Sequence, residues 1–210
     1  MKPRIILLFL TLTSLVGFTA CVVMAEPVRG KKDLAYLKGQ EVLAVEFLYL
    51  DPKVTHTEKE SEYLPEKVEE LNSEKSGRGD LYKTEWHQNK GELYEPAFIE
   101  AMDKELAEDP LKVRHRSNVD KKYEVKAVVK VNRLDPGVQP SRPMKVETRM
   151  LLKDRKSGEV LTELEYDASS FDSTLLAKSF HLRLKKGFKA SGKRYGLYFE
   201  NEGTGLEDGS

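Results

Sequence analysis

Residues 123–131 read Tyr123-Glu124-Val125-Lys126-Ala127-Val128-Val129-Lys130-Val131. Apolar side chains fill every odd position, and charged side chains fill three of the four even positions. A period of two residues is typical of a β-strand that buries one face. Asp135-Pro136-Gly137 follows and predicts the end of this strand, because proline cannot donate to a strand ladder.

Two stretches further along the chain, residues 144–153 and 159–166, alternate in the same way. Residues 154–158 join them and predict a hairpin loop, with Gly158 available for a positive φ. Residues 41–50 are apolar on both faces, which predicts a central strand covered on both sides, and Asp51-Pro52 predicts its end. The pattern therefore predicts about four strands.

Two long stretches have the period of an amphipathic helix. Residues 91–109 end at Asp109-Pro110, because the residue before a proline avoids the helical region. Residues 170–189 offer Ser170 or Asp172 as N-cap and Gly192 after the end. The apolar stripes are Tyr94, Phe98, Met102 and Leu106 in the first helix and Leu176, Phe180, Leu184 and Phe188 in the second.

A short helix is predicted around Leu64, Val68 and Leu71. Together these elements predict an α+β fold, in which a small mixed β-sheet of about four strands carries two long helices packed on it. We expect one domain at residues 40–199. A flexible lead-in at residues 26–39 precedes it, and a disordered acidic tail at residues 200–210 follows.

The composition excludes several classes of protein. Of the 210 residues, 39% are hydrophobic and 33% are charged, which suits one polar globular domain. Lys plus Arg and Asp plus Glu both number 35, so nothing favours a nucleic-acid partner. The single cysteine excludes a disulfide framework within one chain and a cysteine-rich zinc site.

The amino terminus has the pattern of a secretory signal peptide at residues 1–25. Met1-Lys2-Pro3-Arg4 is basic, residues 5–18 are mostly apolar, and Val23-Met24-Ala25 fits a cleavage site. The alternative is a membrane anchor that is retained, because residues 5–24 are just long enough to span a bilayer. Cleavage removes two of the 35 basic residues and leaves 33 against 35 acidic ones, a net charge of −2.

Cys21 allows a second form of processing. Phe18-Thr19-Ala20-Cys21 is similar to a bacterial lipobox, in which a small residue precedes a cysteine that becomes lipidated. Lipidation of Cys21 would anchor the chain to a membrane, whereas cleavage after Ala25 would release it. Both forms predict an exported protein of the periplasm or cell envelope.

The strand pair around residues 123–161 carries a family resemblance. One half runs from Tyr123 through Asp135-Pro136-Gly137 to Arg142, and the other is Leu151-Leu152-Lys153-Asp154-Arg155-Lys156-Ser157-Gly158-Glu159-Val160-Leu161. Together they resemble small bacterial cell-envelope proteins and lipoproteins of unknown function. That group is similar in fold to the amino-terminal domain of the Tol translocation protein and to lipoprotein activators of cell-wall synthases. The resemblance implies no catalytic residues.

The sequence carries no recognisable catalytic or metal-binding motif. No two of the four histidines, His56, His87, His115 and His181, have the i, i+4 spacing of a helical zinc site. No Gly-x-Ser-x-Gly nucleophile elbow and no phosphate-binding glycine loop occurs. We therefore expect no enzyme, no cofactor and no metal.

Charge is the one feature that stands out. Residues 92–109 hold seven acids and one base, a net of −6, and residues 112–133 hold eight bases and two acids, a net of +6. Residues 178–194 hold seven bases and no acid. We expect a partner-binding stripe on the last helix, formed by Arg183, Lys185, Lys186, Lys189, Lys193 and Arg194. The alternative is an ordinary solvated helix face.

The main functional hypothesis is an exported, non-catalytic bacterial envelope protein that acts as a binding or accessory module. Its partner would be an unknown envelope protein or an anionic component of the envelope, such as a phospholipid surface or cell-wall polymer. One alternative is an exported hydrolase with its site in residues 53–90, around Trp86 and His87. A purely structural surface protein is the third.

Overall fold

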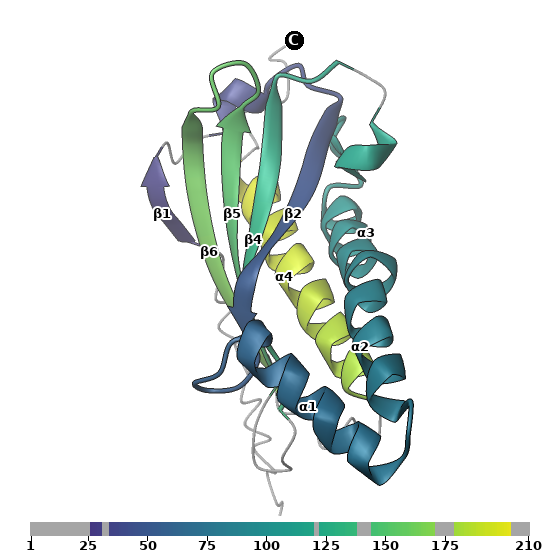
Figure 1. Cartoon of the computed structure of the whole chain (residues 1–210). Helices are drawn as coiled ribbons and strands as arrows, with labels where there is room; N and C mark the ends of the chain where they lie inside the picture. The colour runs from purple at the N-terminus through teal and green to yellow at the C-terminus, as the bar shows by residue number, and fades with distance from the viewer. Residues whose placement is uncertain (1–25, 31–33, 120–121, 138–143, 171–178, 203–210) are drawn as a thin grey trace, which may run out of the picture.

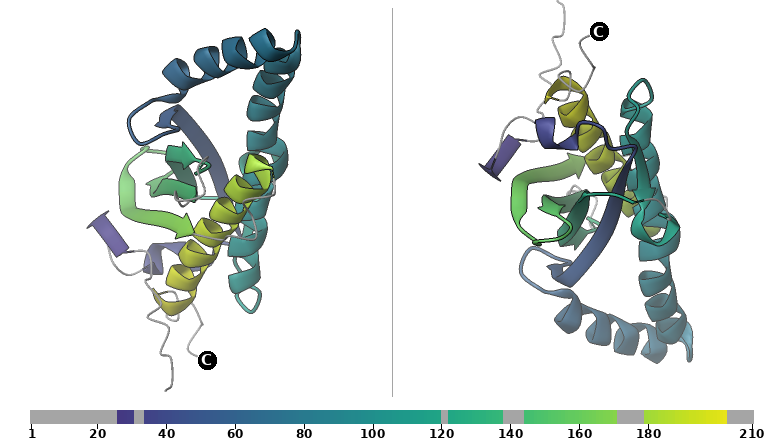
Figure 2. Two further views of the ribbon diagram at one scale, coloured as in Figure 1. Left: turned by 90° about the horizontal axis from the view of Figure 1, so that it is seen from below. Right: turned by 90° about the horizontal axis from the view of Figure 1, so that it is seen from above.

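The structure, a computed structural model, describes residues 26–30, 34–119, 122–137, 144–170 and 179–202. One mixed β-sheet has the strand order β1-β6-β5-β4-β2-β3, and helices cover one of its faces (Figures 1 and 2). The α+β class is therefore as predicted. The strands are β1 (Glu26–Gly30), β2 (Val42–Lys53), β3 (Lys112–His115), β4 (Val125–Asp135), β5 (Met144–Asp154) and β6 (Val160–Ser170).

The sheet centres on the two hairpins that alternate in sequence. β4 pairs antiparallel with β5, with Val129 opposite Met150, and β5 pairs antiparallel with β6. Gly158 in the second hairpin has a φ of 74°, as its place in the loop predicts. β2 runs parallel to both β4 and β3, so the chain must cross over between them, and the helices after β2 make that crossover.

The sheet has six strands instead of about four. β3 has only four residues, which is too short for a clear alternating pattern. β1 lies within residues 26–39, the expected flexible lead-in, and pairs with β6. The same segment contains a 3-10 turn, η1 (Ala35–Leu37), with Leu34 and Leu37 buried beside it.

Strand β2 continues past its expected end. Asp51 has a positive φ of 52°, and the pairing with β4 shifts between Tyr49 and Lys53. An irregularity at Asp51-Pro52 lets the strand bend and resume, instead of stopping at the proline. Leu50 is 68% exposed just before this bend, so β2 is not covered on both faces throughout.

The helices differ from the two long ones expected: the described residues form four, and the one expected to reach Asp109 ends at Glu105. They are α1 (Glu60–Glu74), α2 (Arg78–Asn89), α3 (Glu95–Glu105) and α4 (Phe180–Glu202). A π-helical turn, η2 (Lys90–Tyr94), joins α2 to α3, so the helix expected at residues 91–109 begins well before its predicted start. α3 and α4 pack on the same face of the sheet, and α1 crosses near one end (Figure 2).

The last helix is displaced along the chain from its expected position. Ser170, the expected N-cap, belongs to β6, and Gly192 lies inside α4 instead of after it. Asp172 and Leu176 are outside the described residues. The glycine stays in the helix because its missing side chain lets α4 approach α3: a Cβ there would lie 2.1 Å from the Phe98 carbonyl oxygen.

The core matches the predicted stripes closely. Tyr94, Phe98, Met102 and Leu106 are all buried, from the end of η2 to just after α3, and Leu184 and Phe188 of α4 pack with them against the sheet. Phe180 is the exception, because it is only half-buried at the start of α4. Burial of these side chains determines which face of α4 is exposed to solvent.

The predicted signal peptide at residues 1–25, Cys21 and residues 203–210 of the expected tail lie outside the described residues. Within the tail, Glu200 and Glu202 continue α4. No helix in the part of the chain that the structure describes has the length and apolarity needed to span a membrane.

Candidate functional site

The basic stripe predicted on the last helix lies on α4, and four of its six residues form one exposed face. Lys185, Lys186, Lys189 and Lys193 are all exposed, and we call them the lysine face. Lys185, Lys189 and Lys193 follow each other at intervals of four, so they project from one side of the helix. Leu184 and Phe188, both fully buried, occupy the opposite side. The lysine face is therefore exposed to solvent, while another side of the same helix packs into the hydrophobic core.

The two arginines of the predicted basic stripe, unlike its four lysines, are only partly exposed and bond to other parts of the fold. Arg183 Nη1 donates to the Gly137 carbonyl at 2.7 Å, and Arg194 Nε donates to the Tyr166 hydroxyl at 3.3 Å. The Arg194 guanidinium also lies 5.9 Å from the Tyr166 ring centroid. Both side chains are half-buried. They therefore attach α4 to the rest of the fold and contribute less to a docking surface than the four lysines.

An apolar residue accompanies the lysine face. Leu182 is 43% exposed and precedes Lys185 by three residues, which places the two side chains on neighbouring turns of the same side. At the other end, Lys193 Nζ lies 3.9 Å from Glu105 Oε1, with the lysine side chain 59% exposed. Because the contact is long and the Lys193 side chain is exposed, its ammonium remains available to an external anion.

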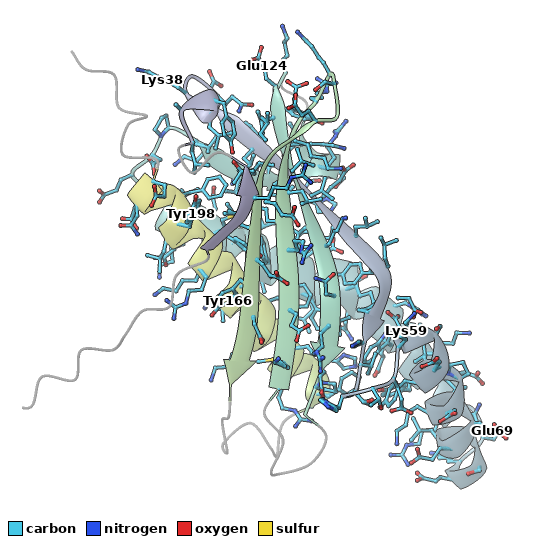
Figure 3. The ribbon with its side chains drawn as sticks, turned by 90° about the vertical axis from the view of Figure 1, so that its left-hand side faces the viewer. Lys38, Lys59, Glu69, Glu124, Tyr166 and Tyr198 are labelled. Carbon is cyan, nitrogen blue, oxygen red and sulfur yellow. The ribbon has the colours of Figure 1, made fainter. Side chains whose placement is uncertain are left out.

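A groove of about 1190 Å³ forms where α1, α2 and β2 meet. Leu64, Pro65 and Val68 of α1 give it an apolar wall, and α2 contributes the opposite wall. Its remaining lining is polar or charged: Tyr49, Asp51, Glu60, Ser61, Glu69, Asn72, Ser73, Asp80, Lys83, His87 and Lys90. Figure 3 shows Glu69 projecting from α1, away from the sheet.

Glu60 organises the inner end of the groove. Its Oε1 accepts hydrogen bonds from Trp86 Nε1 at 2.8 Å and from Lys90 Nζ at 2.5 Å, and His87 Nδ1 lies 3.9 Å away. Lys90 also lies over the Tyr49 ring, 4.8 Å from its centroid. Burial raises the pKa of Tyr49, so its hydroxyl stays protonated. The π-helical turn positions this lysine, and such turns are frequent at functional sites.

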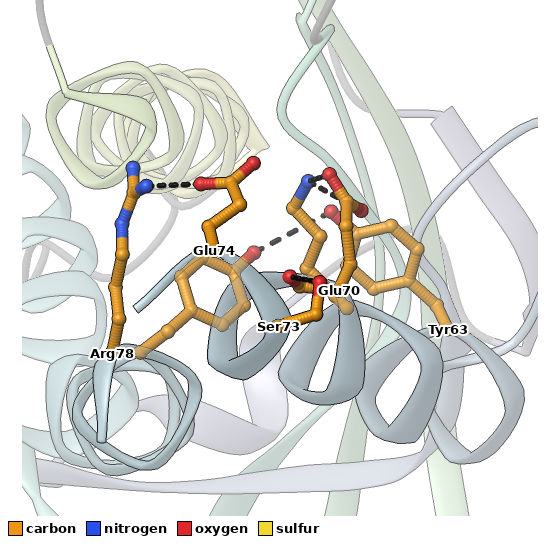
Figure 4. Close-up of polar contacts among 7 residues, drawn as sticks. Tyr63, Glu70, Ser73, Glu74 and Arg78 are labelled. Carbon is orange, nitrogen blue, oxygen red and sulfur yellow. Dashed lines mark hydrogen bonds and ion pairs between the residues drawn. The ribbon is translucent and has the colours of Figure 1, made fainter. Parts of the chain in front are cut away.

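Polar contacts at both ends of α1 hold it to α2 (Figure 4). Arg78 pairs with Glu74 across the turn between the two helices, and the Tyr63 and Tyr82 hydroxyls lie 3.5 Å apart. Within α1, Lys67 pairs with Glu70 at 2.7 Å. These contacts engage Glu70 and Glu74 within the hairpin. Glu62, Glu66 and Glu69 are also exposed on the same helix, and Glu62 Oε2 accepts the Lys59 backbone N–H at 3.2 Å.

The hydrolase alternative placed its site around Trp86 and His87, and the groove lies in that part of the chain. Trp86 itself is buried and bonds Glu60. Ser61 is a nucleophile type in the groove, but its Oγ donates to Asp51 Oδ2 at 2.8 Å. Among the described residues of the groove, no serine is hydrogen-bonded to His87, which a serine nucleophile needs.

A second histidine has serine and carboxylate neighbours, which the sequence search missed. His115 Nδ1 lies 2.6 Å from Ser117 Oγ, and His115 Nε2 lies 3.2 Å from Glu95 Oε2. The same Nδ1 accepts the Ser117 backbone N–H at 3.3 Å, and Ser117 Oγ also donates to Asn118 Oδ1 at 3.1 Å. These short-range bonds cap the 3-10 turn η3 (Arg116–Asn118), which is a structural role.

The remaining histidines are either exposed or structural. His56 is exposed, and His181 is buried with Nδ1 2.7 Å from the Tyr94 hydroxyl. Burial lowers the pKa of His181, and the Glu85 carboxylate opposes that shift. Over the described ranges, no three His, Cys, Asp or Glu side chains are grouped so that they could hold a metal ion.

Neither a protein family nor a curated protein matches the chain by sequence. Several solved structures are similar to it in fold. The PelC dodecamer from Paraburkholderia phytofirmans is 10% identical, with 81% of this chain and 96% of that chain covered and a TM-score of 0.42. A DUF330 protein from Xanthomonas campestris is 10% identical, with 79% and 86% covered and a TM-score of 0.38.

A candidate lipoprotein from Caulobacter crescentus CB15 is 15% identical, with 52% of this chain and 80% of that chain covered and a TM-score of 0.35. At such low similarity these neighbours do not assign the chain to a family or a function. The resemblance to the Tol domain and to cell-wall synthase activators stays a prediction.

Proposed function

We propose that the protein is an exported, non-catalytic module of the bacterial cell envelope that docks on an anionic partner through the lysine face. One observation carries the proposal. α4 separates its residues into a buried apolar side, two half-buried arginines that bond the fold, and four exposed lysines. The exposed cations are therefore held on a rigid helix, at fixed spacing, where a partner can reach them.

The charge of the lysine face supports an anionic partner. An acidic envelope protein, an anionic phospholipid surface and an anionic cell-wall polymer share that chemistry. Exposed charges are screened over about 8 Å at physiological ionic strength, so binding through this face should weaken as salt rises.

Co-purification from a native envelope fraction tests the proposal. Lys185→Glu combined with Lys189→Glu reverses the centre of the lysine face and should reduce partner recovery in dilute buffer. Lys104→Glu combined with Lys156→Glu makes the same change in net charge at two other exposed lysines, so it should leave recovery unchanged. Equal recovery with both folded double variants, at low and moderate salt, would show that the lysine face is only a solvated surface.

Export and anchoring form the second part of the proposal, and the residue pattern at positions 1–25 supports it. Mass spectrometry of the native protein distinguishes the two forms of processing. A start at Glu26 indicates the released form, and a lipidated start at Cys21 indicates the anchored form. An intact Met1 in the cytosol would contradict export.

The groove favours a second candidate function, the exported hydrolase. Its volume of about 1190 Å³ is ample for a small substrate, and it contains His87. Hydrolysis of a panel of nitrophenyl esters by the purified protein, with His87→Ala as comparison, tests this candidate. Turnover that His87→Ala abolishes would support a hydrolase, and no turnover above the buffer rate would count against it.

A further inference from the structure

We infer that the partner of the lysine face is a second copy of this chain, whose groove between α1, α2 and β2 receives that face. The inference rests on the proposed function, because it names what occupies the same surface. α1 carries six acids and one base, a net charge of −5. α4 carries six bases and two acids, a net charge of +4. The molecule therefore presents two helices of opposite charge.

The charged side chains of the two helices have matching spacing. Glu62, Glu66 and Glu69 are exposed on α1 at intervals of four and three, so they form one stripe, which we call the acidic rim. Glu69 lines the groove, and the rest of the rim continues along α1 beside it. With a helical rise of about 1.5 Å per residue, positions on the rim recur at about 4.5–6 Å along α1, and Lys185, Lys189 and Lys193 recur at about 6 Å along α4.

The apolar parts are complementary as well. Leu64, Pro65 and Val68 line the groove, and Leu182 is 43% exposed beside the lysines of α4. Leu182 would contact the apolar wall of the groove while the neighbouring lysines contact its acidic rim, which combines one apolar anchor with charge pairing. Within the groove, Lys90 is already neutralised by Glu60, so it opposes an incoming lysine less than a free ammonium would.

One copy does not bring the two surfaces together. α1 packs mainly against α2, whereas α4 packs mainly against α3 and the sheet. The contact therefore forms between copies. Because each copy offers one lysine face and one groove, two copies can satisfy both by reciprocal contact, or several can close into a ring.

Sedimentation velocity of the purified protein tests this inference, in dilute buffer and at about 0.5 M salt. We expect oligomers in dilute buffer and monomers at high salt. Lys185→Glu/Lys189→Glu and Glu66→Lys/Glu69→Lys should each weaken association about tenfold, since a few exposed ion pairs contribute roughly that factor together. Lys104→Glu/Lys156→Glu should associate like the parent.

A mixture of the two charge-reversed variants provides the decisive test. The glutamates on α4 of one variant then face the lysines on the groove of the other, while the remaining native faces pair as before. Recovery of association in the mixture supports the inference. A parent protein that stays monomeric in dilute buffer, or a mixture of folded variants that stays monomeric, overturns it. Salt-sensitive capture of another anionic partner by a monomeric parent would still leave the proposed function intact.

Discussion

Gly192 of α4 faces the main-chain carbonyl of Phe98 in α3, and a Cβ added at Gly192 would lie 2.1 Å from that oxygen. The two helices are consequently in backbone contact at their crossing. Gly192→Ala should destabilise the protein by about 1–3 kcal/mol or more, because α3 and α4 must separate to admit the methyl group. Urea denaturation measures the loss.

Gly91→Ala is the matched control for that substitution. Gly91 also lies in the helical region, but a Cβ added there meets no atom within 4 Å. We expect its stability to equal or exceed that of the parent, since alanine favours helix over glycine by about 1 kcal/mol. Equal effects of the two substitutions would contradict the close helix crossing.

The position of Gly192 also explains why the end of the last helix was predicted wrongly. A glycine after an apolar stripe is typical of a helix end, and that rule places the end before Gly192. The close approach of α3 supplies a different reason for the glycine, and only the tertiary structure reveals it. In contrast, β4, β5 and β6 were predictable, because their alternation reflects burial of one sheet face.

Loss of the Glu60 carboxylate should lower the free energy of unfolding. Glu60→Ala removes the acceptor of Trp86 Nε1 and the counterion of Lys90, whose side chain is only 13% exposed. Breaking such a buried pair costs about 3 kcal/mol. Thermal and urea unfolding check this value. Glu66→Ala on the exposed side of α1 should stay within about 0.5 kcal/mol of the parent. A similar result for both variants would refute a structural role of Glu60.

Two phenylalanines of the predicted apolar stripe should differ in their contribution. Phe188 is fully buried, so Phe188→Ala should cost about 3–5 kcal/mol. Phe180 is half-buried and stacks 5.6 Å from Trp86, so Phe180→Ala should cost clearly less. Urea midpoints of the two variants decide the order, and a larger loss at Phe180 would contradict the placement of α4.

His181 should make stability depend on pH. Burial holds its pKa below the ordinary value near 6.5, while the facing Glu85 carboxylate opposes that shift and Tyr94 bonds its Nδ1. Below about pH 6.5 the unfolded state then binds more protons than the folded state, so this contribution is present above that pH and is lost as pH falls. The stability advantage of the parent over His181→Gln should therefore shrink between about pH 7 and pH 5. A constant difference would count against the shift.

The candidate site was only partly predictable. The charge run on α4 was visible in the sequence, but the same run includes Arg183 and Arg194, which bond Gly137 and Tyr166. Sequence spacing cannot separate cations that attach a helix from cations that face solvent, because the difference depends on distant segments. The groove was likewise hidden, since α1, α2 and β2 form it only after the helices fold back on the strand.

Photo-crosslinking in intact cells tests the central claim most directly. A photoreactive phenylalanine analogue at position 189 lies in the middle of the lysine face, and the same analogue at position 156 lies in the exposed β5–β6 hairpin loop as control. The account predicts a discrete adduct from position 189, weakened by Lys185→Glu, and no such adduct from position 156. A folded protein that yields no adduct from position 189, or the same adduct from both positions, would contradict docking through the lysine face.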